Sequence, residues 1–239
     1  MPRTLAATHG GEGRTWGSLP ENGPLLLVGG ATTTMKKLMP HPHLGRFTQP
    51  RSKNDLTDIA TCGAWWGADN DALQGLDVDA YLDMLDQIGQ VDRSRLIFVT
   101  APDAAEMTAT GPHVSWEGTL WLWKSWRRAL LARGLPLAIV LQDGATVDSV
   151  PWGELDAVFL GGSDAFKDGP VAAGLLIEAE RRGLWRHVGR LNTQRREKLL
   201  WPICDSFDGT KYSRWPDTHI PACLARLSAG QRSFVEEVA

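Results

Sequence analysis

Short apolar runs that alternate with helix-like segments constrain the fold of this chain more than any other feature. The runs are continuous rather than alternating, which is typical of strands buried on both faces of a parallel sheet. Seven of them lie at 24–30, 63–69, 95–103, 136–144, 157–162, 186–191 and 203–209. Helical patterns between them are clearest at 78–88, 117–134, 169–183 and 193–201. Strands and helices in this order predict parallel βαβ units.

Parallel βαβ units form either an open doubly wound sheet or a closed barrel. An open sheet usually binds its ligand at one switch point, whereas the strands of a barrel all end at one mouth. Nearly every strand-like run here ends in a chemically distinctive residue, namely Asp69, Asp103, Gln142, Gly161 with Gly162, and Asp208. This spread favours an α/β fold of the (β/α)8 TIM-barrel type, with one strand incomplete or irregular.

The domain organisation predicted from the sequence is simple. No linker or internal repeat divides the 239 residues, so a single barrel domain spanning 1–239 is expected. Residues 1–22 are predicted to form a polar N-terminal segment. Residues 31–60 hold prolines, histidines and basic residues without a clean periodicity, and they are predicted to form a long loop over one barrel face.

Composition narrows the environment and the partners. No apolar run approaches the roughly 20 residues of a membrane span, and the N-terminus lacks the apolar stretch of a secretory signal. The three cysteines are widely spaced, which fits reduced thiols. These features predict a cytoplasmic protein with no membrane partner. The net charge of −3 argues against a protein that coats nucleic acid with its whole surface.

The sequence offers little support for a cofactor or a metal. The segment LLLVGGATTTMKK lacks the glycine spacing of a dinucleotide fold and the GKS or GKT of a P-loop. His41 and His43 have no third ligand at a supporting spacing, so surface-loop histidines are the preferred interpretation. We therefore expect no cofactor and no metal.

The strand-end residues together suit one kind of ligand. Carboxylates, one amide and exposed glycine backbone at a shared mouth match a heterocycle with several N–H donors and a carbonyl. The alternative is that each aspartate only caps the helix that follows it. Capping does not account for Gln142 or for the glycine pair, so a shared pocket is favoured.

The order of motifs adds a resemblance. GADND, APD, LQDG, LGGS and CDSFDGT resemble the strand ends of the tRNA-guanine transglycosylase superfamily. The chain is also similar, over about residues 60–217, to small actinobacterial and actinophage proteins related to phage deazaguanine DNA transglycosylases. By this resemblance Asp208 matches the catalytic nucleophile, and the base-binding positions are Asp69, Asp103, Gln142, Gly161 and Gly162.

The resemblance implies a pentosyltransferase that exchanges guanine or a 7-deazaguanine through an aspartyl-glycosyl intermediate. Asp69 or Asp103 would receive and return the proton of the base. The cysteines and histidine of the superfamily's zinc subdomain are absent, and Asn70 and Asp71 replace the usual glycines. The expected partner is therefore a nucleobase, in DNA or as a free nucleoside, rather than tRNA. Further substrate-binding candidates are Trp66, Arg190 and Lys211.

Two other functions stay open at this point. The chain could be a non-catalytic binder of a nucleobase or nucleic acid on the same barrel. It could instead be an accessory protein that binds another protein through tryptophan, since eleven tryptophans are many for this length. Four of these lie on or near one predicted helix, where a core role is the commoner use, namely Trp116, Trp121, Trp123 and Trp126.

Overall fold

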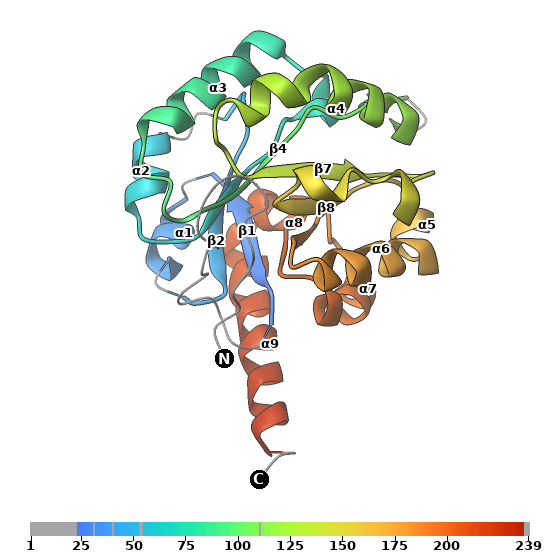
Figure 1. Cartoon of the computed structure of the whole chain (residues 1–239). Coiled ribbons are helices and arrows are strands. Elements are labelled where there is room, and N and C mark those ends of the chain that lie inside the picture. The colour runs from blue at the N-terminus through green and yellow to red at the C-terminus, as the bar shows by residue number, and fades with distance from the viewer. Residues whose placement is uncertain (1–22, 31, 40, 53–54, 110, 237–239) are drawn as a thin grey trace.

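The computed structural model describes residues 23–30, 32–39, 41–52, 55–109 and 111–236. Eight parallel strands close into a barrel in the order β1-β10-β9-β8-β7-β4-β3-β2, with helices around it (Figure 1). The predicted (β/α)8 barrel is thereby confirmed, and its shortest strand has two residues. The strands are β1 Leu25–Gly29, β2 Leu44–Thr48, β3 Trp66–Ala68, β4 Leu96–Thr100, β7 Leu137–Leu141, β8 Ala157–Leu160, β9 Trp185–Val188 and β10 Ser206–Phe207.

The helices follow the strands and cover the outside of the barrel. They are α1 Thr33–Leu38, α2 Leu56–Thr61, α3 Val78–Gln90, α4 Trp116–Leu131, α5 Asp164–Lys167, α6 Pro170–Arg181, α7 Gln194–Leu200, α8 Thr210–Arg214 and α9 Pro216–Glu236. Single 3-10 turns lie at η1 Ala72–Gln74, η2 Val147–Ser149, η3 Trp152–Glu154 and η4 Trp201–Ile203. No helix in these ranges is long and apolar enough to span a membrane.

Residues other than the strand-end aspartates cap the helices. Side chains of Asp55, Asp77, Ser115, Ser163 and Thr193 each accept a hydrogen bond from a backbone N–H in the first turn of a helix. Such caps satisfy donors that have no partner within the helix. The capping interpretation is therefore wrong for the aspartates that follow the strands, and those side chains remain available for the barrel mouth.

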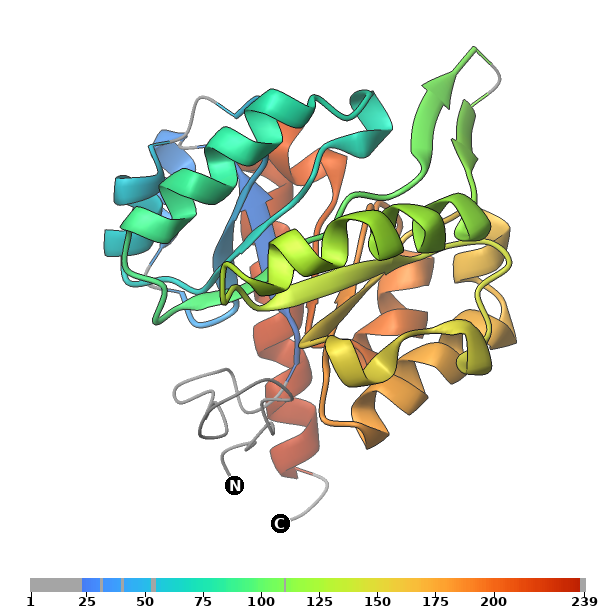
Figure 2. The same cartoon turned by 45° about the horizontal axis from the view of Figure 1, so that its top comes forward.

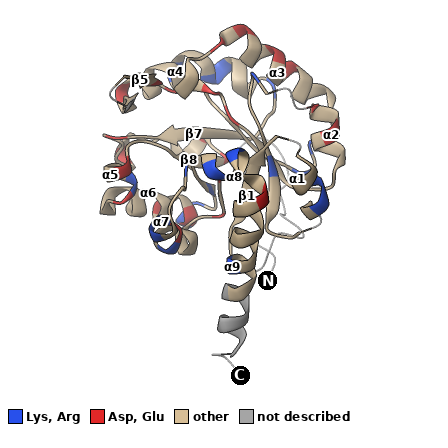
Figure 3. Cartoon of the chain, turned by 180° about the vertical axis from the view of Figure 1, so that it is seen from behind, with Lys and Arg blue, Asp and Glu red and all other residues tan. Residues whose placement is uncertain are grey.

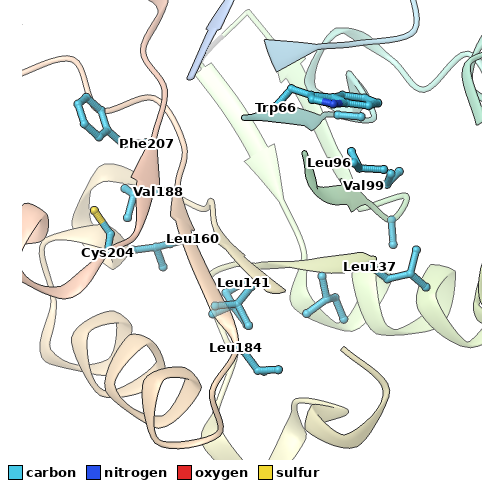
Figure 4. Close-up of a cluster of buried hydrophobic side chains, with 14 of the residues drawn as sticks. Trp66, Leu96, Val99, Leu137, Leu141, Leu160, Leu184, Val188, Cys204 and Phe207 are labelled. Carbon is cyan, nitrogen blue, oxygen red and sulfur yellow. The ribbon is translucent and has the colours of Figure 1, made fainter. Parts of the chain in front are cut away.

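The core consists of two layers, because side chains alternate along each strand. One layer fills the barrel: Leu25, Leu27, Phe47, Trp65, Ile97, Phe98, Ala138, Val140, Ala157, Phe159 and Trp185. The other layer lies between the barrel and the helices. Figure 4 shows part of this outer layer. Trp66 lies near Leu96 and Val99, and Val188 and Phe207 lie on the opposite side of the view.

The predicted loop at 31–60 is wrong. This region contains α1, β2 and α2, and β2 pairs with both β1 and β3 as a full barrel strand. Its sequence, LGRFT, does not read as a buried strand because it contains Gly45 and Arg46. A Cβ on Gly45 would lie 2.6 Å from Leu27 Cδ2 and 2.6 Å from the Trp65 carbonyl oxygen, so close packing requires glycine there. Residues 1–22 lie outside the described residues.

The histidines before β2 also differ from expectation. His43 is fully buried, and its Nδ1 lies 3.1 Å from the carbonyl oxygen of Pro24. The ring of His41 lies 5.8 Å from that of His43. The surface-loop interpretation is therefore wrong for His43, which packs as part of the fold.

The tryptophans of α4 serve mainly in packing. Trp116 and Trp123 are buried, and their indole N–H groups donate to Ser149 Oγ and Glu154 Oε2 at 2.8 and 3.2 Å. Trp126 packs edge to face against Tyr81 at 6.0 Å between ring centroids. Of this group only Trp121 faces solvent, with 67% of its surface exposed.

A buried carboxylate holds the last helices together. Glu197 of α7 accepts from Lys211 Nζ at 2.6 Å, Tyr212 OH at 2.7 Å and Arg226 Nη2 at 2.7 Å. These hydrogen bonds connect α7, α8 and α9, and α9 extends well beyond the barrel in Figure 1. Figure 3 shows the charged residues from behind the view of Figure 1, with basic residues on α8 and at the lower end of α7.

An antiparallel hairpin interrupts the barrel pattern after β4. Strands β5 (Ala105–Thr108) and β6 (Gly111–Val114) pair with each other and form their own two-stranded sheet. Figure 2 shows the hairpin projecting from the body of the barrel beside α4. β5 also lies against η1, so the hairpin and η1 form one continuous wall.

Candidate active site

A cavity of about 390 Å³ opens at the carboxyl ends of the barrel strands. Its floor is apolar and is formed by Leu27, Phe47, Val140 and Phe159, which belong to the inner layer of the core. The hairpin and η1 contribute part of its wall. The rim is polar, and its residues follow the strands as the barrel requires: Asp69, Asn70, Asp71, Asp103, Gln142, Gly161, Gly162, Arg190 and Asp208.

Most of the residues predicted for the site line this one cavity. The structure brings together Asp69, Asp103, Gln142, Gly161, Gly162, Arg190 and Asp208. Trp66 and Lys211 are the two exceptions. Trp66, the first residue of β3, is fully buried in the outer layer, because Trp65 directly before it takes the inward position. The ammonium group of Lys211 lies against Glu197, away from the cavity.

Asp69 carries its proton near neutral pH. Burial raises the pKa of its carboxyl to about 8, and the negative charges of Asp103 and Asp208 act in the same direction. Oδ1 accepts a hydrogen bond of 2.9 Å from the backbone N–H of Asn70. Asp69 lines the cavity, so a protonated carboxyl is available there as a proton donor.

Asp103 has a different environment, because two side-chain amides point at it. Asn70 Nδ2 donates to Oδ1 at 2.7 Å, and Gln142 Nε2 donates to Oδ2. Backbone N–H groups fix both amides: Ala72 donates to Asn70 Oδ1 at 2.8 Å, and Ser115 donates to Gln142 Oε1 at 3.0 Å. Burial raises the pKa of Asp103 to about 6, while the bond from Asn70 and the charge of Arg190 oppose this shift. Asp103 is therefore largely ionised at pH 7.

Asp208 has a hydrogen-bond partner at each carboxylate oxygen. His187 Nε2 lies 3.0 Å from Oδ2, and the backbone N–H of Arg190 donates to Oδ1 at 3.1 Å. The Asp208 side chain is 18% exposed and lines the cavity, whereas His187 is fully buried. Asp69 and Asp208 thus bring two hydrogen-bonded carboxyl groups to one cavity.

Two loop residues at the rim have left-handed backbone conformations. Asp71 has φ 57° and Arg190 has φ 56°, values that are uncommon for residues other than glycine. The Arg190 side chain donates to the carbonyl oxygen of Gly162 at 3.0 Å. Non-glycine residues in such conformations cluster at functional sites. Gly162, with φ 77°, has no room for a side chain, because a Cβ would lie 2.7 Å from Asp143 Oδ2.

Two contributors to the site were not among the residues predicted for it. Asn70 was treated as a departure from a motif, but its amide orients Asp103. His187 contacts Asp208 from the neighbouring strand, and its position two residues after the inward-facing Trp185 was the available signal.

Among the residues that the structure describes, neither a metal site nor a lysine nucleophile lies at this cavity. Among the described residues, no three or more His, Cys, Asp or Glu side chains are grouped so that they could hold a metal ion. Burial lowers the pKa of Lys167 to about 8. Its Nζ donates to the carbonyl oxygen of Gly189 at 3.3 Å, and Lys167 is not among the residues that line the cavity.

Comparisons with known proteins identify the fold and no family. No family model and no curated protein matches the chain. Among solved structures, a tryptophan synthase from M. tuberculosis matches with a TM-score of 0.52 and 12% identity, covering 87% of this chain and 92% of that one. A native KDPGal protein matches with a TM-score of 0.50 and 12% identity, covering 90% and 95%. A 4-hydroxy-2-oxoglutarate aldolase matches with 0.47 and 15% identity, covering 87% and 92%.

These findings correct the expected family and activity. The resemblance to the tRNA-guanine transglycosylase superfamily is wrong, since no family model or curated sequence supports it and the tryptophan synthase and KDPGal matches are not transglycosylases. The expected guanine-exchanging pentosyltransferase activity depended on that resemblance and is wrong as well. The two alternatives, a nucleobase binder and an accessory protein, gain no support. The motifs misled because parallel barrels place polar residues at strand ends whatever chemistry they perform.

Proposed function

We propose that this protein is an acid–base enzyme of the lyase or isomerase type that acts on a small carbonyl compound. The observation that carries the proposal is the pairing of a protonated Asp69 with a hydrogen-bonded Asp208 at one cavity. Two carboxyl groups in different environments are a common way in which one site supplies both an acid and a base.

In the proposed reaction, Asp208 removes a proton and Asp69 supplies one. Asp208 takes a proton from the carbon next to the carbonyl, or from a β-hydroxyl group. The released electron pair forms the enol double bond directly in the first case. In the second case the electron pair of the O–H bond forms the new carbonyl. The electron pair of the breaking C–C bond then forms the enol double bond. In both cases the Asp69 proton moves to the carbonyl oxygen, so atoms and charge balance.

The charges of the cavity favour a neutral or cationic substrate. Four carboxyl groups line it, whereas Arg190 is the one Lys or Arg side chain among the described lining residues. A surplus of one sign in a cleft attracts ligands of the opposite sign and repels those of its own. The apolar floor excludes water beneath the reacting groups, which strengthens their electrostatic interactions. The unpaired Cys62, Cys204 and Cys223 also fit work in the reducing cytoplasm.

Deuterium exchange tests this proposal without knowledge of the natural substrate. The protein is incubated in D₂O with hydroxyacetone, aminoacetone or pyruvate, which are neutral, cationic and anionic carbonyl compounds of similar size. Proton NMR then follows loss of the signals next to the carbonyl. We expect faster exchange with the first two than with pyruvate, and Asp208→Asn should lower the rate by about 100-fold or more.

The control is Asp83→Asn, which makes the same change at an exposed position of α3. It should exchange at the rate of the unaltered protein. The proposal is contradicted if none of the three compounds exchanges faster than without protein, or if Asp208→Asn leaves the rate unchanged.

A further inference from the structure

A chain of hydrogen bonds runs through the barrel interior and ends at Asp208. The indole Nε1 of Trp185 donates to Ser206 Oγ at 2.8 Å, and Ser206 Oγ lies 2.8 Å from His187 Nδ1. His187 Nε2 lies 3.0 Å from Asp208 Oδ2. Trp185, Ser206 and His187 are all buried, so protein groups alone satisfy these atoms.

The chemistry of the four groups allows this chain to run in one direction from end to end. An indole N–H only donates, so Ser206 Oγ accepts from Trp185. The Ser206 hydroxyl has one hydrogen of its own, which it can donate to His187 Nδ1 while its oxygen accepts from Trp185. In this direction His187 donates from Nε2 to Asp208 Oδ2. Every hydrogen then points toward the carboxylate, and such aligned bonds polarise one another.

The pairing of β9 and β10 produces this arrangement. Ser206 is in register with His187, and Phe207 is in register with Val188. Alternate residues of each strand face the interior, so Trp185 and His187 of one strand meet Ser206 and then Asp208 of the other. Phe207 and Val188 point outward into the layer beneath the helices (Figure 4).

Aromatic rings hold the imidazole in place. The ring centroids of Phe47, Phe98 and Phe159 lie 5.4, 5.1 and 4.5 Å from that of His187. A side chain packed on several sides has few alternative rotamers. The ring orientation that Asp208 requires is therefore set by packing as well as by hydrogen bonds.

We propose that Trp185, Ser206 and His187 are positioning residues that form a one-directional relay and hold the Asp208 carboxylate toward the cavity. In the relay, His187 donates to Asp208 from Nε2. Together with the Arg190 backbone N–H on the other oxygen, it restricts rotation of the carboxylate. Its contribution to proton removal rests on the proposed function, whereas its existence does not.

Nitrogen NMR tests the relay with no substrate present. Long-range ¹H–¹⁵N spectra distinguish a protonated from an unprotonated imidazole nitrogen, and His187→Gln identifies the His187 signals. We expect Nδ1 unprotonated and Nε2 protonated near pH 7. Ser206→Ala should shift the Nδ1 signal, while Ser206→Thr, which keeps the hydroxyl, should preserve the pattern. A protonated Nδ1 in the unaltered protein, or no change in Ser206→Ala, would overturn the relay.

The exchange assay then measures what the relay contributes to catalysis. Ser206→Ala should lower the maximal exchange rate by about tenfold with little change in half-saturating substrate, because Asp208 itself remains. Equal loss in Ser206→Thr would overturn the hydroxyl's role. If the NMR pattern is as expected but no carbonyl compound exchanges, the proposed function fails alone. If exchange depends on Asp208 but the tautomer differs, the relay fails alone.

Discussion

The side-chain amide of Asn70 donates to Asp103 Oδ1 at 2.7 Å, while its own oxygen accepts from the backbone N–H of Ala72 at 2.8 Å. Asn70 and Asp103 are both buried, so water does not compete for these bonds. A group that can both donate and accept is needed at position 70. The pair therefore gives a direct test of how the mouth tolerates its surplus of carboxyl groups.

Asn70→Asp should destabilise the protein by about 2–4 kcal/mol at pH 7, because it replaces a donor with a second acid next to Asp103. The loss should shrink at pH 5, where one of the two acids takes up a proton. Urea unfolding at the two pH values measures both effects. Gln194→Glu makes the same chemical change at an exposed site and should stay within about 0.5 kcal/mol of the unaltered protein. Equal losses for the two variants would contradict the prediction.

Asp69→Asn should make the protein more stable above about pH 5. The folded-state pKa of Asp69 is raised to about 8, so the folded state binds the proton more tightly than the unfolded state does. Stability therefore falls as pH rises from the unfolded pKa near 4 to the folded one near 8. Asparagine removes this dependence. The difference in free energy of unfolding between Asp69→Asn and the unaltered protein should grow by about 2–4 kcal/mol from pH 5 to pH 8. Urea unfolding across this range measures it, and parallel curves of stability against pH would refute the prediction.

The rate of carbonyl exchange should decline as pH rises through about 8, because Asp69 then loses the proton that it donates. Asp69→Asn should be slower by about 100-fold at pH 7 and should lose this decline. A pH–rate profile of both proteins measures the effect. A decline that persists unchanged in Asp69→Asn would assign it to another group.

Glu197→Ala should destabilise the protein by about 3–5 kcal/mol, because Lys211 and Arg226 lose their buried partner together with the Tyr212 hydroxyl. Urea unfolding measures the loss. Glu117→Ala removes an exposed glutamate in the first turn of α4, and its expected effect is below about 1 kcal/mol. A loss for Glu197→Ala as small as that of the control would show that the cluster does not support the last helices.

Gly45→Ala should cost about 1–3 kcal/mol, since its Cβ would meet the Trp65 carbonyl oxygen at 2.6 Å and that carbonyl is held by the Arg46 backbone N–H of the same strand as Gly45. Gly89→Ala is the matched control, because its Cβ would lie in open space within α3. It should stabilise the protein by about 0.5–1 kcal/mol. Thermal and urea unfolding of the two variants should therefore change in opposite directions.

The sequence predicted seven barrel strands because each is a continuous apolar run. The eighth strand, β2, was not predicted because Gly45 and Arg46 interrupt its apolar pattern. The close approach of Trp65 is the reason that position 45 requires glycine. Strand ends predicted most of the cavity residues, since a parallel barrel brings them to one mouth. Trp66 was misplaced because a shift of one residue moves a side chain to the other face of a strand.

The activity was harder to predict than the fold. Short motifs at strand ends carried the transglycosylase hypothesis, yet the protonation of Asp69 and the orientation of Asn70 depend on burial and on neighbours that are distant in sequence. Such properties exist only once the chain has folded. Site chemistry must therefore be derived from the assembled structure.

The β5–β6 hairpin gives this barrel a separable part. It lines the cavity through Ala105 and Val114, yet its strands pair with each other and contribute no strand to barrel closure. Changes in its length or side chains can therefore alter which molecules enter the cavity while the Asp69 and Asp208 pair stays in place. Under the proposed function, substrate choice and catalytic chemistry can therefore evolve independently, because different segments of the chain encode them.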